Sequence, residues 1–312
     1  MLRYSLKRLA SAVPTLFLLI TVAFFLIRIA PGGPFDSERA LPAEIEANLA
    51  AKYHLDEPLV MQYGRYIWQI VRLDFGPSFH YLDWTVNDLI IQGAPVSFTL
   101  GILALIMALV VGIPIGVWAA WRQNRPSDYT VMGVAMIGIS IPNFVLAPLL
   151  ILLFAITLGW LPAGGWEYSF SRMVLPVITL ALPMIAYVAR ITRGSMIEVL
   201  HSSFIRTARA KGLPEKEVLI NHALKPALLP VISYLGPAAA AILTGSVVVE
   251  RIFTIPGIGS YFVQGALNRD YTLVMGVVIL YGILIIVFNF LVDLLYAWLD
   301  PRIRYDDLES ES

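Results

Sequence analysis

Charged side chains that could recognise another molecule are concentrated in one segment, residues 203–230, between two long apolar stretches. Arg206, Arg209 and Lys211 occur within six residues, and two glutamates follow shortly after them. Such a cluster can dock a soluble partner through charge-assisted contacts. The alternative is a basic loop that only fixes the orientation of the chain in a membrane. Charge alone leaves both interpretations open.

Other kinds of chemistry are excluded by what the sequence lacks. It has no cysteine, so disulfides, thiolate catalysis and cysteine metal sites are ruled out. It has neither a phosphate-binding loop of the GxxxxGKS or GxxxxGKT type nor an HExxH motif, and no Ser/His/Asp or paired-carboxylate arrangement stands out. The four histidines lack metal-ligand spacing. The sequence therefore predicts a protein that is not an enzyme and binds no cofactor or metal of its own.

The long apolar stretches also lack ionisable residues near their centres. Arg28 and Asp293 lie near ends, where a side chain can reach the membrane interface. A charge at the bilayer centre costs about 2.5–3.5 kcal/mol, and carriers driven by protons or sodium ions usually keep one there to bind the coupling ion. A transport path through this chain is therefore either a passive channel or driven by a partner.

The composition is that of a protein that crosses a membrane many times. Of 312 residues, 58% are hydrophobic and 14% are charged, whereas soluble domains carry about a quarter charged residues. The formal net charge is zero, which argues against nucleic acid as a partner. The N-terminal run resembles a signal peptide, but it is long and its one plausible cleavage point is flanked by Arg28 and Pro31, so we expect a retained first span.

Six apolar stretches meet or approach the length of about 20 residues that crosses the hydrocarbon core. The fourth is the weakest, because it contains Pro176 and Pro183, but the charge balance requires it. Proline and glycine also recur elsewhere, as at Gly112, Pro114 and Gly116, which indicates kinked and closely packed helices. We therefore predict an all-α polytopic membrane protein whose six transmembrane helices cover residues 10–30, 97–121, 129–158, 173–189, 226–249 and 271–292.

The placement of basic residues predicts the orientation of these spans. With the N-terminus in the cytoplasm, the cytoplasmic segments hold fourteen of the 22 basic residues, so both termini are predicted to lie inside. Residues 31–94 hold four basic and nine acidic residues, a poor composition for the cytoplasmic side. The acidic tail, 306–312, is expected to be disordered. We expect a cytoplasmic N-terminus and first transmembrane helix over 1–30, a periplasmic region over 31–94, and a transmembrane core with helices 2–6 over 95–312, including the cytoplasmic loop 203–230.

Aromatic residues are spaced among the charges of the region 31–94, at Tyr63, Tyr66, Trp68 and Trp84. This spacing favours surface helices that lie near the lipid interface, where amphipathic rings act as anchors. A binding role for these rings is the alternative.

Within residues 203–230 the pattern predicts a helix, a tight corner and a second helix. Residues 204–211 permit a helix, Gly212 can take the left-handed conformation that ends it, and Pro214 suits the first turn of the next. The basic residues fall near the end of the first helix, whereas Glu215 and Glu217 fall in the first turn of the second. Each charge thus matches the nearby end of a helix dipole.

Several motifs resemble one known family. RTARAKG at residues 206–212 resembles the loop by which permease subunits of ATP-binding cassette importers dock on their ATPase, in the branch for peptides and nickel. Arg206 stands where a glutamate is common in other importers, and Lys225 replaces an early proline, but both are typical of the peptide branch. The likeness covers nearly the whole chain and favours the oligopeptide members through ERALP at 38–42 and GALNRDY at 265–271. It also includes LKRLASAVPTLFLL near the N-terminus, DFGPSF at 74–79, ARITRGSMIEVL at 189–200, HALKPALLP at 222–230 and residues 250–259.

This resemblance implies a bacterial inner-membrane permease that forms half of a translocation pathway for oligopeptides. The implied partners are a second homologous permease subunit, two cytoplasmic ATPase subunits that bind ATP and Mg, a periplasmic peptide-binding protein, the peptide substrate and membrane lipid. The residues that it implies for ATPase coupling are Phe204, Arg206, Thr207, Ala208, Arg209, Ala210, Lys211 and Gly212.

The proline- and glycine-containing stretch 250–260 is predicted to lie beside the pathway, because a bent segment at membrane depth needs protein or water to satisfy its backbone. With the resemblance, it becomes a candidate periplasmic gate formed by Glu250, Phe253, Pro256, Gly257 and Gly259. Three polar residues of the spans are candidates for lining the path, although helix packing is the alternative role for each. They are Asn143, Thr244 and Ser246.

Other functions stay open at this point. Dipeptide and nickel permeases share most of the motifs, so either is an alternative within the same family. Outside it, the alternatives are a passive channel and a membrane scaffold that only recruits a receptor.

Overall fold

The computed structural model describes residues 2–29, 33, 48 and 51–299. Its described residues form helices and no strand, apart from one isolated bridge between Pro77 and Thr85. This confirms the predicted all-α class. The predicted acidic tail, 306–312, lies outside the described residues, as does most of the first half of the predicted periplasmic region.

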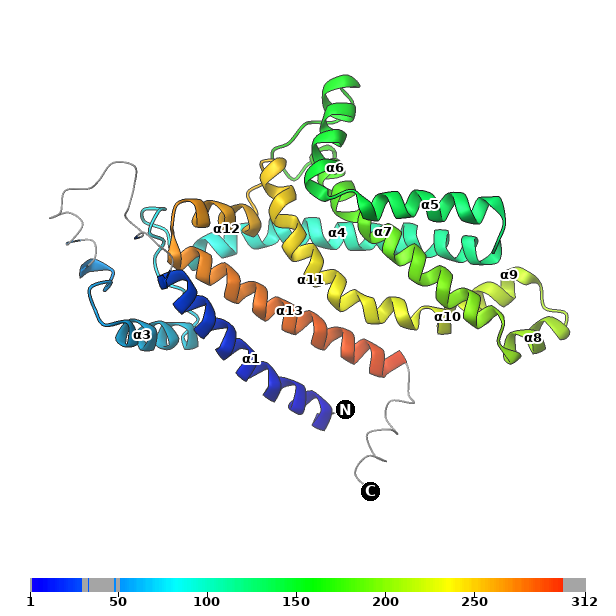
Figure 1. Cartoon of the computed structure of the whole chain (residues 1–312), viewed down its shortest axis with the longest axis horizontal. Helices are drawn as coiled ribbons and strands as arrows, with labels where there is room; N and C mark the ends of the chain where they lie inside the picture. The colour runs from blue at the N-terminus through cyan, green and yellow to red at the C-terminus, as the bar shows by residue number, and fades with distance from the viewer. Residues whose placement is uncertain (1, 30–32, 34–47, 49–50, 300–312) are drawn as a thin grey trace.

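The helices follow one another along the chain as labelled in Figure 1. Their bounds are α1 Leu2–Ile29, α3 Leu59–Val71, α4 Val86–Trp121, α5 Pro126–Ser140, α6 Asn143–Leu150, the π-helix η1 Ile151–Thr157, α7 Phe170–Leu200, α8 Ser203–Ala210, α9 Glu215–Glu217, the π-helix η2 Val218–Ala223, α10 Leu224–Ala227, α11 Leu229–Ile252, α12 Ile258–Leu267 and α13 Tyr271–Leu299.

Four single helices are long and apolar enough to cross a membrane, and two bent helix pairs bring the number to as many as six. The third predicted span, 129–158, is not a straight helix, because the chain bends by 104° between α5 and the pair α6–η1. The bend falls at Pro142, which precedes α6 with an extended backbone. Proline restricts the residue before it to extended conformations, so α5 ends there.

Two other spans are longer than their apolar stretches. α4 begins at Val86, well before residue 97, because Thr85 and Asp88 form a capping box that starts the helix in a polar segment. α7 runs unbroken from Phe170 to Leu200 and includes both of its prolines. Its apolar window is 56% buried within the protein, against 28% for α4, so neighbouring helices cover more of α7 than of α4.

Glycine allows α4 and α7 to approach each other closely. A Cβ added at Gly112 would lie 2.9 Å from the Cβ of Val188, and one at Gly116 would lie 2.5 Å from the Cβ of Thr192. The two glycines are four residues apart and therefore share one face of α4, the spacing typical of close helix contacts in membranes. This confirms the predicted close packing at these positions.

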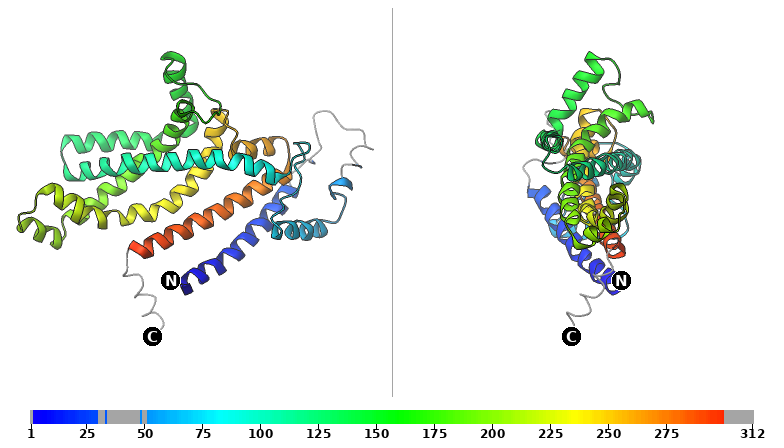
Figure 2. Two further views of the ribbon diagram at one scale, coloured as in Figure 1. Left: turned by 180° about the vertical axis from the view of Figure 1, so that it is seen from behind. Right: turned by 90° about the vertical axis from the view of Figure 1, so that its right-hand side faces the viewer.

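The remaining helices are arranged around this pair, with two distinct ends (Figures 1 and 2). α8 and α9 lie at one end, whereas α3 and α12 lie at the other. α1 and α13 run side by side in opposite directions along one flank, and Thr21 on α1 also contacts Tyr63 on α3, with 2.6 Å between the hydroxyl oxygens. The start of α1 and the end of α13 thus point to the same side, as the predicted topology requires.

The close approach of α4 and α7 predicts the effect of adding one methyl group. Gly116→Ala should lower the thermal unfolding midpoint of the purified protein, because the new Cβ overlaps Thr192 and overpacking of this kind costs about 1–3 kcal/mol. Gly133→Ala on α5 is the matched control, since its Cβ meets nothing within 4 Å. Equal midpoints for the two variants would contradict the packing argument.

Candidate functional site

The charged segment folds as a helix, a corner and a second helix, as predicted. α8 ends at Ala210, and Gly212 has φ +80°, the left-handed conformation that glycine adopts without strain. Its N–H donates to the carbonyl of Arg209 at 2.9 Å and so closes the helix end. Pro214 then immediately precedes α9. The local sequence is therefore sufficient to explain this corner.

The inner face of α8 is bound to the membrane helices through apolar contacts. Ile205 is fully buried and Ala208 is 5% exposed, so both point into the protein. Ala208, one of the predicted coupling residues, is thus a packing residue in this structure. The buried side chains of this cluster come from α4, α7, α8, η2 and α10: Ala120, Met196, Leu200, Ile205, Ala208, Val218, Ala223 and Ala227.

The other predicted coupling residues, on the outer face of α8 and in the two positions after it, are all exposed: Phe204, Arg206, Thr207, Arg209, Ala210, Lys211 and Gly212. Arg209 donates to both carboxylate oxygens of Glu215, at 2.6 and 3.2 Å, which bridges the corner. In the described part of the chain, neither Arg206 nor Lys211 forms an ion pair. Two cations and one aromatic ring are thus available to a partner on this face.

The second helix of the segment is less regular than the sequence indicates. It changes from α9 to the π-helix η2 and back to α10, and the chain then bends by 50° into α11. Pro226 lies in α10, and a proline ring clashes with the carbonyl of the residue four positions earlier, here His222 in η2. The wider π-helix relieves such a clash. Sequence reasoning missed this feature, and Pro226 was the available signal.

At the opposite end, the predicted gate is built around a fully buried carboxylate, that of Glu250. The Ser97 hydroxyl on α4 donates to Glu250 Oε1 at 2.7 Å, and the N–H of Ser260 on α12 donates to Oε2 at 3.1 Å. Ser97 Oγ also accepts the N–H of Ile258, at 2.9 Å. The carboxylate and one hydroxyl therefore satisfy the first N–H groups of α12, which would otherwise be unpaired in an apolar setting.

The two glycines of the predicted gate provide the space for this carboxylate. A Cβ at Gly257 would overlap both Glu250 and Ser97, and a Cβ at Gly259 would lie 2.5 Å from the Cα of Val247. Phe253 is fully buried, and its carbonyl accepts the N–H of Gly165 at 2.7 Å. Among the five predicted gate residues, Pro256 is the exposed one.

The three predicted pathway residues occupy different surroundings. Ser246 is 1% exposed and hydrogen-bonds to Glu250, so it belongs to the buried cluster. Asn143 begins α6 and is half-buried, and its Oδ1 has no hydrogen-bond partner among the described residues. The side chain of Thr244 lies outside the described residues.

Comparison with known proteins now identifies the family. Residues 112–305 match the family model described as "binding-protein-dependent transport system inner membrane component", which covers more than half of the chain. The chain belongs to this family. It is a membrane component of such a system, located in the inner membrane, and not itself an enzyme. Membership of this family implies that the chain has three kinds of partner: an ATPase, a substrate-binding protein and a second permease.

Individual relatives extend this likeness over almost the whole permease. This chain is 58% identical to the oligopeptide transport system permease protein OppB of Salmonella typhimurium, over 98% of this chain and 100% of the relative. It is 47% identical to the dipeptide transport system permease protein DppB of Bacillus subtilis, over 97% of this chain and 98% of the relative.

Solved structures share the fold of the permease at lower identity. A structure of the MetNI methionine ABC transporter in an inward-facing conformation matches with a TM-score of 0.59 and 18% identity, covering 68% of this chain and 96% of its own. A structure of an amino acid ABC transporter with histidines matches with a TM-score of 0.54 and 19% identity, covering 67% of this chain and 94% of its own.

Two polar contacts of the permease were not predicted from the sequence. Asp128 is fully buried and accepts two hydrogen bonds from Arg193, at 2.6 and 2.7 Å, which ties α5 to α7. Asp270, also fully buried, accepts the N–H groups of Leu273 and His80 and so joins the start of α13 to the loop before α4. An aspartate directly before an apolar run is a helix-start signal that could have revealed the second contact.

The buried carboxylate predicts how the permease responds when it is removed. Glu250→Ala should lower the thermal unfolding midpoint and expose residues 253–257 to protease, because it leaves the Ser97 hydroxyl and the Ser260 N–H buried without an acceptor. A buried donor left unpaired costs about 1–3 kcal/mol.

Glu198→Ala is the control for that experiment, since Glu198 is exposed on α7 and makes no buried contact that the substitution would break. The explanation fails if Glu250→Ala matches this control in both stability and protease resistance.

Proposed function

We propose that the chain is the permease subunit of an ATP-driven oligopeptide importer and forms half of its translocation pathway. The observation that carries this proposal is the contrast in identity: 58% to an oligopeptide permease, against 47% and 41% to two dipeptide permeases, each over at least 97% of the chain. The names of these relatives differ in the length of the peptide that they transport.

The proposed orientation places α8 and both termini in the cytoplasm and α3 and α12 on the periplasmic side. The basic residues support it, since seven of them lie between residues 190 and 225, around α8. The same orientation divides the chain into residues 1–30, the periplasmic region 31–94 and the permease core 95–312. In this arrangement α8 meets cytoplasmic ATPase subunits and the α11–α12 corner meets the periplasmic receptor.

Coupling to the ATPase is proposed to run through α8. Its exposed face presents Phe204, Arg206 and Lys211, a ring and two unpaired cations that suit a helix-in-groove contact with an acidic rim. Its buried face is packed against the ends of α4 and α7 and against η2, which leads into α11. A displacement of α8 therefore moves α7 and α11 together.

The energy for this displacement is proposed to come from ATP and Mg bound by two partner ATPase subunits. A second, homologous permease completes the pathway. The Glu250 corner is proposed to border the entrance from the receptor, where its buried hydrogen bonds hold α12 to α4 and α11. Asn143, with an unpaired amide oxygen, is the polar residue that we favour for lining the path.

Uptake by cells tests the function directly. In a strain lacking only this chain, uptake of a labelled oligopeptide should be lost, and it should return when the gene is restored, whereas dipeptide and nickel uptake should stay unchanged. Loss of dipeptide or nickel uptake alone would favour the other permeases of the family. Conduction by the purified chain without ATPases would show a passive channel instead.

Charge reversal on α8 tests the coupling surface. Arg206→Glu should reduce oligopeptide uptake and peptide-stimulated ATP hydrolysis about tenfold, equivalent to ~1.4 kcal/mol of docking free energy. Lys216→Glu is the matched control, because Lys216 is an exposed cation of the same segment on α9 rather than α8. Equal effects of the two reversals would show that only the general charge of the segment matters.

The corner glycine offers a second test of coupling. Gly212→Ala should weaken coupling, because a left-handed residue with a Cβ costs about 1–2 kcal/mol. The space around Gly212 is open, with nothing within 4 Å of an added Cβ, so any effect comes from the backbone and not from a clash. Gly212→Asn should stay close to wild type, since asparagine tolerates this conformation. Uptake unchanged in the alanine variant would argue against a tight corner as a requirement.

A further inference from the structure

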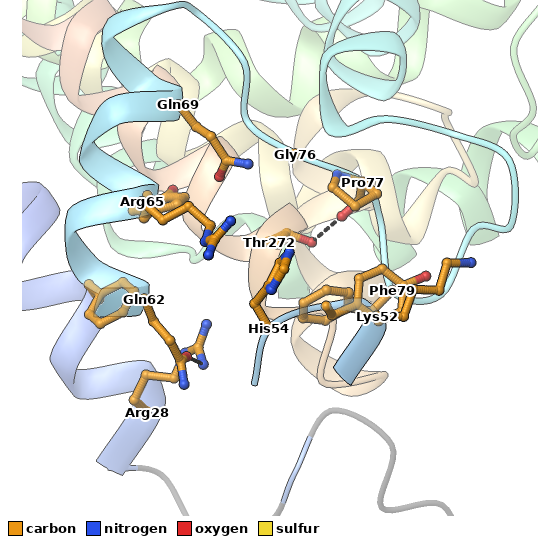
Figure 3. A pocket seen from close by; sticks show the side chains of 13 residues that line it. Arg28, Lys52, His54, Gln62, Arg65, Gln69, Gly76, Pro77, Phe79 and Thr272 are labelled. Carbon is orange, nitrogen blue, oxygen red and sulfur yellow. Dashed lines mark hydrogen bonds between the residues drawn. The ribbon is translucent and has the colours of Figure 1, made fainter. Parts of the chain in front are cut away.

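A basic pocket lies at the end of α1, away from both the α8 segment and the Glu250 corner. It is formed by the last turn of α1, one face of α3, the residues just before α3 and the loop before α4 (Figure 3). Figure 3 shows Arg28 from α1 and Gln62 from α3 reaching toward each other, with the guanidinium of Arg65 nearby. The hydroxyl of Thr272 closes the pocket by donating to the carbonyl of Pro77 at 2.7 Å.

Two buried donors in the wall of this pocket have no acceptor among the described residues. They are Nε of Arg28 and the hydroxyl of Tyr66. Tyr66 is only 7% exposed and is held by its ring against Phe24, with 5.8 Å between ring centroids. Burial raises the pKa of Tyr66, so its hydroxyl stays protonated and able to donate. Unpaired buried donors are costly, and a ligand with acceptor oxygens would satisfy both of them.

The charges that face the pocket are mostly positive. Arg28, Lys52 and Arg65 line it, together with His54. Glu57 lies beside them and pairs with Arg65 at 2.6 Å and with His54 at 3.1 Å. In the described part of the chain, Arg28 and Lys52 have no carboxylate partner. Among the described residues that line the pocket, the charge balance is therefore positive, which suits an anion.

The position of α3 indicates the origin of this anion. Gln62, Arg65, Tyr66 and Gln69 share the face of α3 that lines the pocket, since they follow helical spacing. The opposite face of α3 exposes large apolar side chains, including Val60 at 78%, Trp68 at 58% and Val71 at 69%. A helix with an apolar exposed face and a basic polar face is typical of a membrane interface.

We propose that this pocket binds the phosphate of a phospholipid headgroup, in the leaflet that meets α3. The phosphate oxygens accept from Arg28 Nε and from the Tyr66 hydroxyl, and Lys52 and Arg65 supply the positive field. The cavity measures about 260 Å³, below the ~300–1,000 Å³ of pockets that enclose a drug-sized ligand. It therefore suits a headgroup whose acyl chains remain outside, along the apolar face of α3.

The test measures lipid binding to the intact transporter complex in detergent. Three probes are titrated: dioctanoyl phosphatidylglycerol, dioctanoylglycerol without a phosphate, and inorganic phosphate. We expect saturable binding of the phosphatidylglycerol, at least tenfold tighter than either other probe. Arg28→Gln should weaken it about ten- to hundredfold, as expected for a lost charge-assisted hydrogen bond.

Tyr66→Phe is the decisive variant if Arg28→Gln does not fold. It removes a hydroxyl that has no partner in the described structure, so stability without lipid should be unchanged or raised while lipid affinity falls. Arg72→Gln is the matched control, because Arg72 is a nearby cation that stacks over Trp68 outside the pocket, 4.5 Å from the ring centroid.

Several results would overturn the proposal. Unchanged affinity in both pocket variants, or an equal loss in Arg72→Gln, would show diffuse surface attraction. Equally tight binding of dioctanoylglycerol would show that only acyl chains bind, and equally tight inorganic phosphate would show a site for a soluble anion. A photo-crosslinker at position 54 that captures a receptor protein and no lipid would assign the pocket to protein contact.

Discussion

The contact between α4 and α7 is the interaction on which the other parts of this permease depend. In a membrane, apolar surface gives no driving force for helix association, so close van der Waals contact must supply it. Gly112 and Gly116 make that contact possible by letting the backbone of α7 approach α4 without intervening side chains. α5 is then tied to α7 through Asp128 and Arg193, and α8 packs against the far ends of both central helices. The α8 end and the α12 end of the molecule are thus connected through one closely packed pair of helices.

The short helices at these two ends are held in place by different interactions. At the α8 end, apolar burial of Ile205 and Ala208 fixes a short helix whose other face stays open to water and charged. At the α12 end, a fully buried carboxylate accepts hydrogen bonds at the buried start of a short helix. The first arrangement suits exchange with a soluble partner. The second suits a corner that keeps its shape while the surrounding helices move.

The segment from α1 to α4 is attached to this framework separately and carries the proposed lipid pocket. Its helix α3 is attached to α1 by aromatic contacts and by the hydroxyl contact between Thr21 and Tyr63, not by the central pair. A lipid held at Arg28 and Tyr66 would fix α3 relative to the membrane surface and leave α4 and α7 free to tilt. Lipid composition would then influence the α3 end of the permease without acting on α8.

The sequence by itself determined what depends on local chemistry: the apolar stretches, the charge bias, and the corner in which Gly212 takes a left-handed conformation just before Pro214. The family motifs are likewise short, continuous stretches that can be read directly from the sequence. Only the tertiary structure shows which prolines break a helix, since Pro142 ends α5 whereas Pro176 and Pro183 remain inside α7, whose apolar window is 56% buried. It also decided that Ala208 faces inward, that Glu250 is buried, and that Arg28 and Tyr66 meet at one pocket. The physical reason is distance along the chain. Burial and hydrogen bonding depend on residues far apart in sequence, such as Ser97 and Glu250. No local sequence pattern predicts that these residues come into contact.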